Sequence, residues 1–138
     1  MIDLKSSFGK RVARRLEEER IIWLTTVDSN GSPQPRPVWF LWDGKTILVF
    51  SRKAGYKIQH IQNNGKVSLN LDSDGQGGDI VVLLGNAIIE ETAISAEQIE
   101  QYFEKYTQGL ARLNMTPEEF QRSYSVVIRI SPTLLRGH

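Results

Sequence analysis

The sequence has no cysteine and only two histidines, His60 and His138. Without cysteine there are no disulfides, no thiolate nucleophile and no cysteine-based metal site, and two histidines are too few for a multi-histidine metal centre. No apolar run approaches the roughly 20 residues that a membrane-spanning helix needs. The first residues lack the apolar stretch of a secretory signal peptide. We therefore expect a cytoplasmic protein that does not associate with membranes.

The sequence also lacks an excess of either charge. It carries 17 Lys and Arg against 16 Asp and Glu, a formal net charge of +1. A near-neutral chain has no general electrostatic attraction to nucleic acid, so we expect no nucleic-acid partner. A chain of 138 residues is long enough for a hydrophobic core and matches one domain, which we expect to span residues 1–138.

Apolar periodicity predicts a chain with more strands than helices. Leu4, Phe8, Val12 and Leu16 recur at every fourth position and predict a helix over residues 3–19. Further helices are expected at 55–63, after Ser95 and after Thr116. Alternating or β-branched runs predict strands at 21–27, 36–42, 46–51, 66–72, 79–90 and 123–131. Strands that follow one another closely pair as hairpins, so we expect a mainly β protein with an antiparallel closed or split barrel.

Two strands deserve separate comment because of their prolines and glycine. Pro33, Pro35 and Pro37 occupy every second position and remove hydrogen-bond donors from one side of the chain, which predicts a sheet edge. The following run 38–42 is apolar on both faces, so we expect it to be buried or to lie beneath a ligand or partner. Gly85 interrupts the strand 79–90 and predicts a bulge or a close backbone approach.

The stretch from Arg36 to Lys57 holds the candidate binding site. We predict a hairpin turning at Asp43-Gly44, in which Phe50 and Ser51 lie opposite Arg36 and Pro37. Cationic groups gather at its far end, where a helix is expected to begin: Arg36, Arg52, Lys53 and Lys57. A helix N-terminus favours phosphate, and the Ser51 hydroxyl can donate a hydrogen bond. An apolar wall beside such a cluster suits a flat ligand with a phosphate tail, although an ordinary basic loop with a surface arginine would give the same pattern.

The sequence offers no recognisable set of acid, base and nucleophile. Trp39 could stack on an aromatic ligand or pack in the core, Trp42 suits the core or a subunit interface, and His60 has polar neighbours typical of a structural or solvated residue. The acidic residues between 72 and 79 do not have the EF-hand spacing, and the glycines of 75–78 do not form a P-loop. A binding site without catalytic side chains fits a protein whose cofactor supplies the chemistry.

From Thr25 to about Glu90 the sequence resembles the pyridoxamine 5′-phosphate oxidase-like flavin-binding split barrels, and more narrowly their small, probably F420-dependent members. The resemblance is carried by R-P-V-W-F-L-W-D-G from Arg36, V-F-S ending at Ser51, Y-K-I-Q-H-I around Lys57, and G-N-A from Gly85. It implies a six-stranded antiparallel split β-barrel of Greek-key type with flanking helices. It also implies a homodimer with FMN or F420 sites at the subunit interface.

The resemblance further implies the role of individual residues. Arg36 and Lys57 would hold the cofactor phosphate, with Ser51 hydrogen-bonded to the same group. The ring would be lined by Pro37, Val38 and Trp39, and Phe50 and Arg52 complete the expected cofactor-binding set. FMN fits one compact cation cluster, whereas the more anionic tail of F420 would need a longer basic groove.

Departures from the oxidase pattern bear on the substrate. Leu41 stands where the oxidase has a lysine, Tyr56 replaces its helix arginine, and the residues up to His138 lack its C-terminal Trp and Arg pattern. We therefore expect an FMN- or F420-dependent oxidoreductase that transfers hydride to or from another small organic molecule, and not a true pyridoxamine phosphate oxidase. The alternative is a non-catalytic flavin- or haem-binding protein of the same fold.

Overall fold

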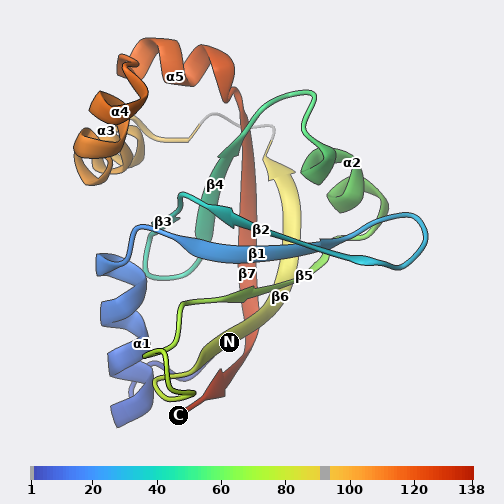
Figure 1. The fold of residues 1–138 in the computed structure, drawn as a ribbon, viewed down its shortest axis with the longest axis vertical. Coiled ribbons are helices and arrows are strands. Elements are labelled where there is room, and N and C mark those ends of the chain that lie inside the picture. The colour runs from blue at the N-terminus through green and yellow to red at the C-terminus, as the bar shows by residue number, and fades with distance from the viewer. Residues whose placement is uncertain (1, 91–93) are drawn as a thin grey trace.

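A computed structural model describes residues 2–90 and 94–138 of the chain (Figure 1). Within these residues lie five helices and seven strands. The helices are α1 (Ser7–Glu18), α2 (Tyr56–Asn63), α3 (Ala96–Lys105), α4 (Thr107–Leu113) and α5 (Pro117–Ser123). The strands are β1 (Ile22–Val27), β2 (Pro33–Val38), β3 (Leu41–Trp42), β4 (Ile47–Ser51), β5 (Lys66–Asn70), β6 (Val81–Glu90) and β7 (Val126–Gly137).

All seven strands belong to one sheet in the order β2-β1-β5-β6-β7-β4-β3, and every neighbouring pair is antiparallel. β2 and β3 lie at opposite ends of this order, yet only Trp39 and Phe40 separate them along the chain. Two residues cannot span a flat sheet, so the sheet curls until its ends come together, and β1 and β2 cross over β4 and β7 (Figure 1). The predicted mainly β split-barrel fold is confirmed.

The strand count and one hairpin differ from the prediction. The predicted strand 36–42 is interrupted after Val38, and its two parts become β2 and β3, which gives seven strands instead of six. β3 pairs with β4 only at Leu41–Leu48 and Trp42–Ile47. Arg36 therefore lies opposite Leu24 of β1, and the predicted pairing of Arg36 with Ser51 is wrong. The register was counted outward from the turn at Asp43-Gly44, and this count assumed that residues 36–42 form one continuous strand.

Other features of the strands agree with the sequence. β2 pairs only with β1, as expected for an edge carrying three prolines. The pairing of β6 with β7 shifts register between Leu84 and Gly85, where a Cβ on Gly85 would lie 2.5 Å from the Ser131 carbonyl oxygen. β7, however, extends to Gly137 and not only to residue 131, because the chain beyond Pro132 continues to pair with β6.

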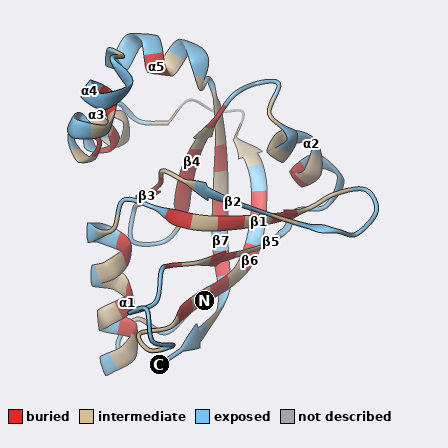
Figure 2. Ribbon diagram, viewed as in Figure 1, coloured by how far each residue is buried: buried red, intermediate tan, exposed pale blue. Residues whose placement is uncertain are grey.

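Two hydrophobic cores explain the run that is apolar on both faces. Val38, Phe40 and Trp42 pack in or against the core inside the half-barrel, which α1 closes with Val12 and Leu16. Trp39 and Leu41 belong to a second core beneath α3, α4 and α5. Figure 2 shows buried residues along the inner strands and on the sheet-facing side of α1. Alternate residues of this run thus enter different cores of the same chain.

The helices expected at 55–63, after Ser95 and after Thr116 are confirmed, whereas the helix expected over 3–19 begins only at Ser7 and α4 was not expected. Thr116 and Glu119 form the capping box at the start of α5, and Ser95 caps α3 through Gln98 N–H. Arg15 of α1 donates hydrogen bonds to the carbonyl oxygens of Asp79 (2.8 Å) and Asp72 (2.6 Å). Among the described residues no helix is long and apolar enough to cross a membrane.

Candidate functional site

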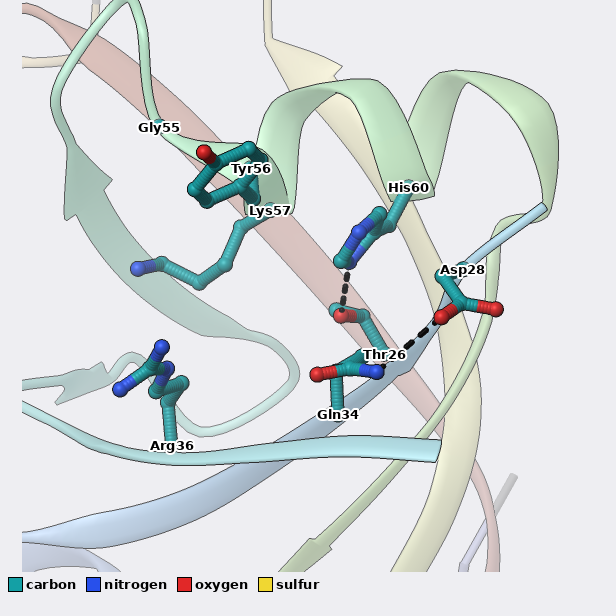
Figure 3. Close-up of a pocket in the computed structure, with 8 residues that line it drawn as sticks. All are labelled: Thr26, Asp28, Gln34, Arg36, Gly55, Tyr56, Lys57 and His60. Atoms are coloured by element: carbon teal, nitrogen blue, oxygen red, sulfur yellow. Dashed lines mark hydrogen bonds between the residues drawn. The ribbon is translucent and has the colours of Figure 1, made fainter. Parts of the chain in front are cut away.

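Two cavities adjoin at Lys57, one polar and one apolar. The polar cavity, of about 570 Å³, is lined by Thr26, Asp28, Gln34, Arg36, Gly55, Tyr56, Lys57 and His60 (Figure 3). The apolar cavity, of about 290 Å³, is lined by Pro37, Val38, Trp39, Phe50, Lys57, Tyr102, Leu113, Phe120 and Tyr124. Because Lys57 lines both, a ligand that fills the apolar cavity can reach the polar one past a positive charge.

The polar cavity is built by a hairpin and one end of a helix. β1 and β2 pair so that Thr26 lies opposite Gln34, and Arg36 follows two residues along β2 on the same face. The first two turns of α2 supply Tyr56, Lys57 and His60. In Figure 3 the charged ends of Arg36 and Lys57 extend into the same part of the cavity.

Arg36 and Lys57 form a pair of like charges. Burial lowers the pKa of the Lys57 ammonium, and the positive charge of Arg36 lowers it further. Within residues 2–90 and 94–138, neither side chain has a carboxylate within ion-pair distance. Two neighbouring cations without a counter-ion disfavour each other, and an anion bound between them would remove this cost.

The N-terminus of α2 adds to the same electrostatics. Its cap residue Gly55 makes no side-chain capping hydrogen bond, so side chains do not occupy the first N–H groups of the helix. A Cβ at Gly55 would lie 3.1 Å from the Arg52 carbonyl oxygen and from Ser51 Oγ, so glycine suits this close turn. Uncapped N–H groups and the helix dipole favour an anion beside Lys57.

The opposite side of the polar cavity carries neutral and acidic groups. His60 Nδ1 lies 2.8 Å from the hydroxyl of Thr26, which is buried. Asp28 accepts hydrogen bonds from Ser32 N–H and Asn30 N–H, each 2.9 Å, and from Gln34 Nε2. These bonds, that from Ser32 first, lower the pKa of the Asp28 carboxyl, which stays ionised at neutral pH.

The sequence-predicted site residues fall into three groups. Arg36 and Lys57 line the polar cavity, and Pro37, Val38, Trp39 and Phe50 line the apolar one. Ser51 and Arg52 line neither. Ser51 is buried, with its hydroxyl donating to the Arg52 carbonyl oxygen at 3.3 Å. The Arg52 guanidinium lies over the Tyr124 ring, 5.1 Å from its centroid.

Aromatic side chains from distant parts of the chain form the wall of the apolar cavity. The Trp39 ring stacks on Tyr106, with centroids 4.5 Å apart, and Phe50 meets the edge of Tyr102 at 4.6 Å. Trp39 therefore both packs in the second core and lines the cavity. Helices α3 to α5 close this cavity, and sequence reasoning did not assign their residues Tyr102, Leu113, Phe120 and Tyr124 to the site.

Sequence reasoning also missed most of the polar cavity. It classed His60 as structural or solvated, and it did not consider Thr26, Asp28 or Gln34. One signal was present, because His60 follows Lys57 by three residues and therefore shares its helix face. Among the described residues there is no group of His, Asp or Glu suited to hold a metal ion.

Comparisons with known proteins identify the family of the chain. Residues 8–138 match the family described as Pyridoxamine 5′-phosphate oxidase, and the chain belongs to this family. It is 30% identical over 120 residues to General stress protein 26 of Bacillus subtilis, covering 81% of this chain and 85% of that protein. A crystal structure of a putative pyridoxamine 5′-phosphate oxidase from Listeria innocua is 26% identical, with a TM-score of 0.68 over 92% of this chain and 94% of that one.

More distant structures share the fold and are named for different ligands. A FAD-binding protein from Mesorhizobium loti is 19% identical, with a TM-score of 0.68 over 92% of this chain and 89% of its own. An F420 reductase is 22% identical, with a TM-score of 0.63 over 89% and 94%. HutZ, a heme storage protein of Vibrio cholerae, is 15% identical, with a TM-score of 0.69 over 99% and 95%. The same fold thus occurs in proteins named for FAD, F420 and heme.

Proposed function

We propose that this protein is an FMN-dependent oxidoreductase. The observation that carries the proposal is the pair of cavities joined at Lys57, with aromatic walls on one side and, on the other, two cations that form no ion pair within the described part of the chain. A flavin has a flat apolar ring and a phosphate at the end of a polar chain. The ring would occupy the apolar cavity, and the phosphate would lie between Arg36 and Lys57 at the start of α2.

The residues of this chain would bind, orient and exclude water. When bound, FMN supplies hydride transfer to or from a small organic molecule. Trp39 and Phe50 would hold one edge of the ring away from solvent, and Arg36 and Lys57 would fix the opposite end through charge-assisted hydrogen bonds. No side chain is assigned as acid or base, because the apolar cavity proposed to hold the ring is lined mainly by aromatic and aliphatic side chains.

F420 is the alternative cofactor. Its longer anionic tail would need a basic groove beyond Arg36 and Lys57. Arg15 is bonded to the 72–79 loop, Arg52 is packed on Tyr124, and the cations that line the polar cavity are Arg36 and Lys57. This arrangement favours FMN over F420.

The substrate is proposed to differ from pyridoxamine phosphate. Leu41, which stands where the oxidase has a lysine, is buried in the second core and offers no charge to a substrate. Tyr56, in place of the helix arginine, is 77% exposed at the rim of the polar cavity. Neither position supplies the cation that a second phosphate would require.

Binding and reduction experiments test the proposal together. The purified protein is titrated with FMN and with F420 and followed by absorbance and fluorescence, and the bound cofactor is then offered NADH, NADPH or reduced F420. Tight FMN binding with reduction by one donor supports the proposed oxidoreductase. Failure of both cofactors to bind would refute it.

A non-catalytic binding protein is the second candidate, because His60 lines the polar cavity and Thr26 engages only its Nδ1. The other ring nitrogen could serve as a haem ligand. A haem titration with a Soret shift that disappears in His60→Ala would favour this function. Bound flavin that no donor can reduce would favour storage or sensing of flavin instead.

We further propose that the protein acts as a homodimer with the cofactor sites near the subunit interface. Support comes from the family and from apolar residues that remain exposed on the outer face of the sheet, Ile88 and Leu134.

A further inference from the structure

The polar cavity is larger and chemically richer than one phosphate requires. Its volume is about 570 Å³, against about 290 Å³ for the apolar cavity proposed to hold a ring. Arg36, Lys57 and Tyr56 occupy one side of it, whereas Asp28 and His60 lie on the other (Figure 3). A phosphate held between the two cations would leave this second group of side chains unused.

Tyr56 and His60 form an aromatic platform at the rim. They stand one helical turn apart on α2, with nearly parallel rings (22°) whose centroids are 6.5 Å apart. This separation is wider than the 4.5 Å of the stacked Trp39–Tyr106 pair. The Tyr56 side chain is 77% exposed, so its ring offers a free face to a planar ligand. Nucleobases bind proteins by stacking on such faces.

Asp28 brings an ionised carboxylate to the polar cavity. Its hydrogen bonds to backbone N–H groups keep the carboxylate ionised and fix its position in the turn between β1 and β2. A fixed carboxylate near a bound phosphate accepts hydrogen bonds from ribose hydroxyls in many nucleotide sites. The cavity thus combines cations for phosphate, a carboxylate for ribose and an aromatic platform for a base.

We propose that the polar cavity binds the adenosine phosphate part of a dinucleotide, with the base against Tyr56 and His60 and the ribose near Asp28. This inference rests on the proposed flavin site. In FAD, the adenosine phosphate follows directly on the flavin phosphate, so one molecule can extend from the apolar cavity past Lys57 into the polar one. The same chemistry is present in the pyridine nucleotides, which would enter as separate molecules.

Titrations of the full chain with FMN, FAD and ADP-ribose test the inference. For FAD as the ligand, we expect binding at least about tenfold tighter than that of FMN, because its adenine adds a stacking contact that FMN lacks. If the ligand of the polar cavity is instead a separate pyridine nucleotide, we expect FAD to bind no tighter than FMN, and ADP-ribose to bind to the protein already loaded with FMN. If FAD binds no tighter than FMN and ADP-ribose does not bind, the inference is wrong while the FMN site stands. If neither flavin binds, the proposed function itself fails.

Tyr56→Ala separates stacking from phosphate binding. Tyr56 is exposed, so its removal leaves both hydrophobic cores intact, and thermal melting confirms the fold. We expect FAD or ADP-ribose binding to weaken about tenfold in Tyr56→Ala, to be retained in Tyr56→Phe, and FMN binding to change by less than about twofold. Asp28→Asn should weaken the binding of FAD more than the binding of FAD analogues whose adenosine lacks the 2′ and 3′ hydroxyls. Equal losses for FMN and FAD in Tyr56→Ala would overturn the proposal.

Discussion

The ammonium group of Lys57 lies in an environment that disfavours its positive charge. It is half-buried, lies beside Arg36, and its pKa is lowered by both effects. A lysine whose pKa is lower in the folded state than in the unfolded state lowers the free energy of unfolding at every pH at which it is charged. This destabilisation reaches its full size at pH values below the lowered pKa. As pH rises from the lowered pKa towards the model-peptide value of about 10.4, the unfolded state holds more protons and the stability of the fold rises.

The charge of Lys57 should therefore favour ligand binding at the expense of stability. We expect Lys57→Met to raise the melting temperature of the ligand-free protein at pH 7, because the methionine needs no desolvation of a charge. The same variant should weaken FMN binding by roughly 1.5–3 kcal/mol, or about 10- to 150-fold, through the loss of a charge-assisted bond. Calorimetry and flavin titration measure the two effects.

Lys53 provides the matched control, because it is exposed four residues earlier and lines neither cavity. Lys53→Met should leave flavin affinity and melting temperature nearly unchanged. Arg36→Met should weaken FMN binding to a similar extent as Lys57→Met. Unaltered affinity in both cavity variants would show that the phosphate is not held between these cations.

Lys105 is a second lysine whose pKa is lowered by burial. Its pKa is lowered to about 8, mainly by burial and then by Arg20, while Glu19 acts in the opposite direction. Its ammonium donates a hydrogen bond to the Phe40 carbonyl oxygen at 3.0 Å and lies 3.8 Å from the centre of the Phe40 ring. These contacts favour the charged form, but they only partly offset the lost hydration.

We expect Lys105→Met to be more stable than the wild type at pH 7. Because the folded pKa is about 8, the difference should shrink as pH rises above 8 towards the unfolded pKa. The single proton of the Tyr106 hydroxyl lies within reach of both the Arg20 carbonyl (2.7 Å) and the Phe40 carbonyl (2.9 Å), so in this variant the hydroxyl can turn to donate to Phe40. Urea unfolding at pH 7 and at a pH near 10 gives the comparison, and a difference that grows with pH would contradict the assignment.

At the scale of elements, the link between β2 and β3 decides where both cavities form. Its backbone at Phe40 is held by a side chain, because the Phe40 N–H donates to the Tyr106 hydroxyl at 2.8 Å. The Tyr106 hydroxyl in turn lies 2.7 Å from the Arg20 carbonyl oxygen. Helix α3 thus fixes the point at which the chain leaves one end of the sheet for the other.

Tyr106→Phe should loosen this link. The change leaves the buried Phe40 N–H without a partner, which we expect to cost about 1–3 kcal/mol of unfolding free energy. Tyr124→Phe is the control, because its hydroxyl bonds only the exposed Arg52 at 3.3 Å and the residue is half-buried. Similar unfolding midpoints for the two variants would show that the Phe40 bond is of no special importance.

Local patterns could predict most elements of the fold from the sequence. The fourfold period of Leu4 to Leu16 gave α1, the alternate prolines gave the sheet edge, and Gly85 gave the bulge, because each depends on neighbouring residues. The break between Val38 and Leu41 could not be predicted, since Tyr106, which holds the backbone at Phe40, lies 66 residues away from it. The length of β7 was hidden by Pro132, which normally ends a strand.

Of the candidate site, only the residues within the stretch from Arg36 to Lys57 could be predicted from the sequence. Arg36, Lys57 and the apolar run were identified by residue type and by family resemblance, even though the register that was to bring them together was wrong. Their convergence depends on the curl of the sheet, which brings β2 towards the start of α2. The aromatic wall from α3 to α5 and the Thr26–His60 contact depend on tertiary packing, and no short-range pattern specifies them.

At the scale of the whole molecule, the outer face of the sheet carries more apolar side chains than a solvent-facing sheet surface usually does. Alternation along β6 points Val81, Leu83 and Ala87 into the core, and Leu84 and Ile88 outwards. Leu134 of β7 pairs with Leu84 on the same face. Ile88 and Leu134 are 56% and 41% exposed. The strand run 38–42, which the sequence suggested as a possible interface, is instead covered by the chain's own two cores.

We therefore expect a homodimer that covers the outer face of β6 and β7, because large apolar side chains exposed on one sheet face favour an interaction surface there. Light scattering at micromolar concentration should give twice the chain mass of 15.7 kDa. Ile88→Asp combined with Leu134→Asp should give the monomer mass, whereas Ile21→Asp, at an exposed position before β1, should not. A monomeric wild type would contradict the dimer, and a dimer that survives the double change would place its interface on another face.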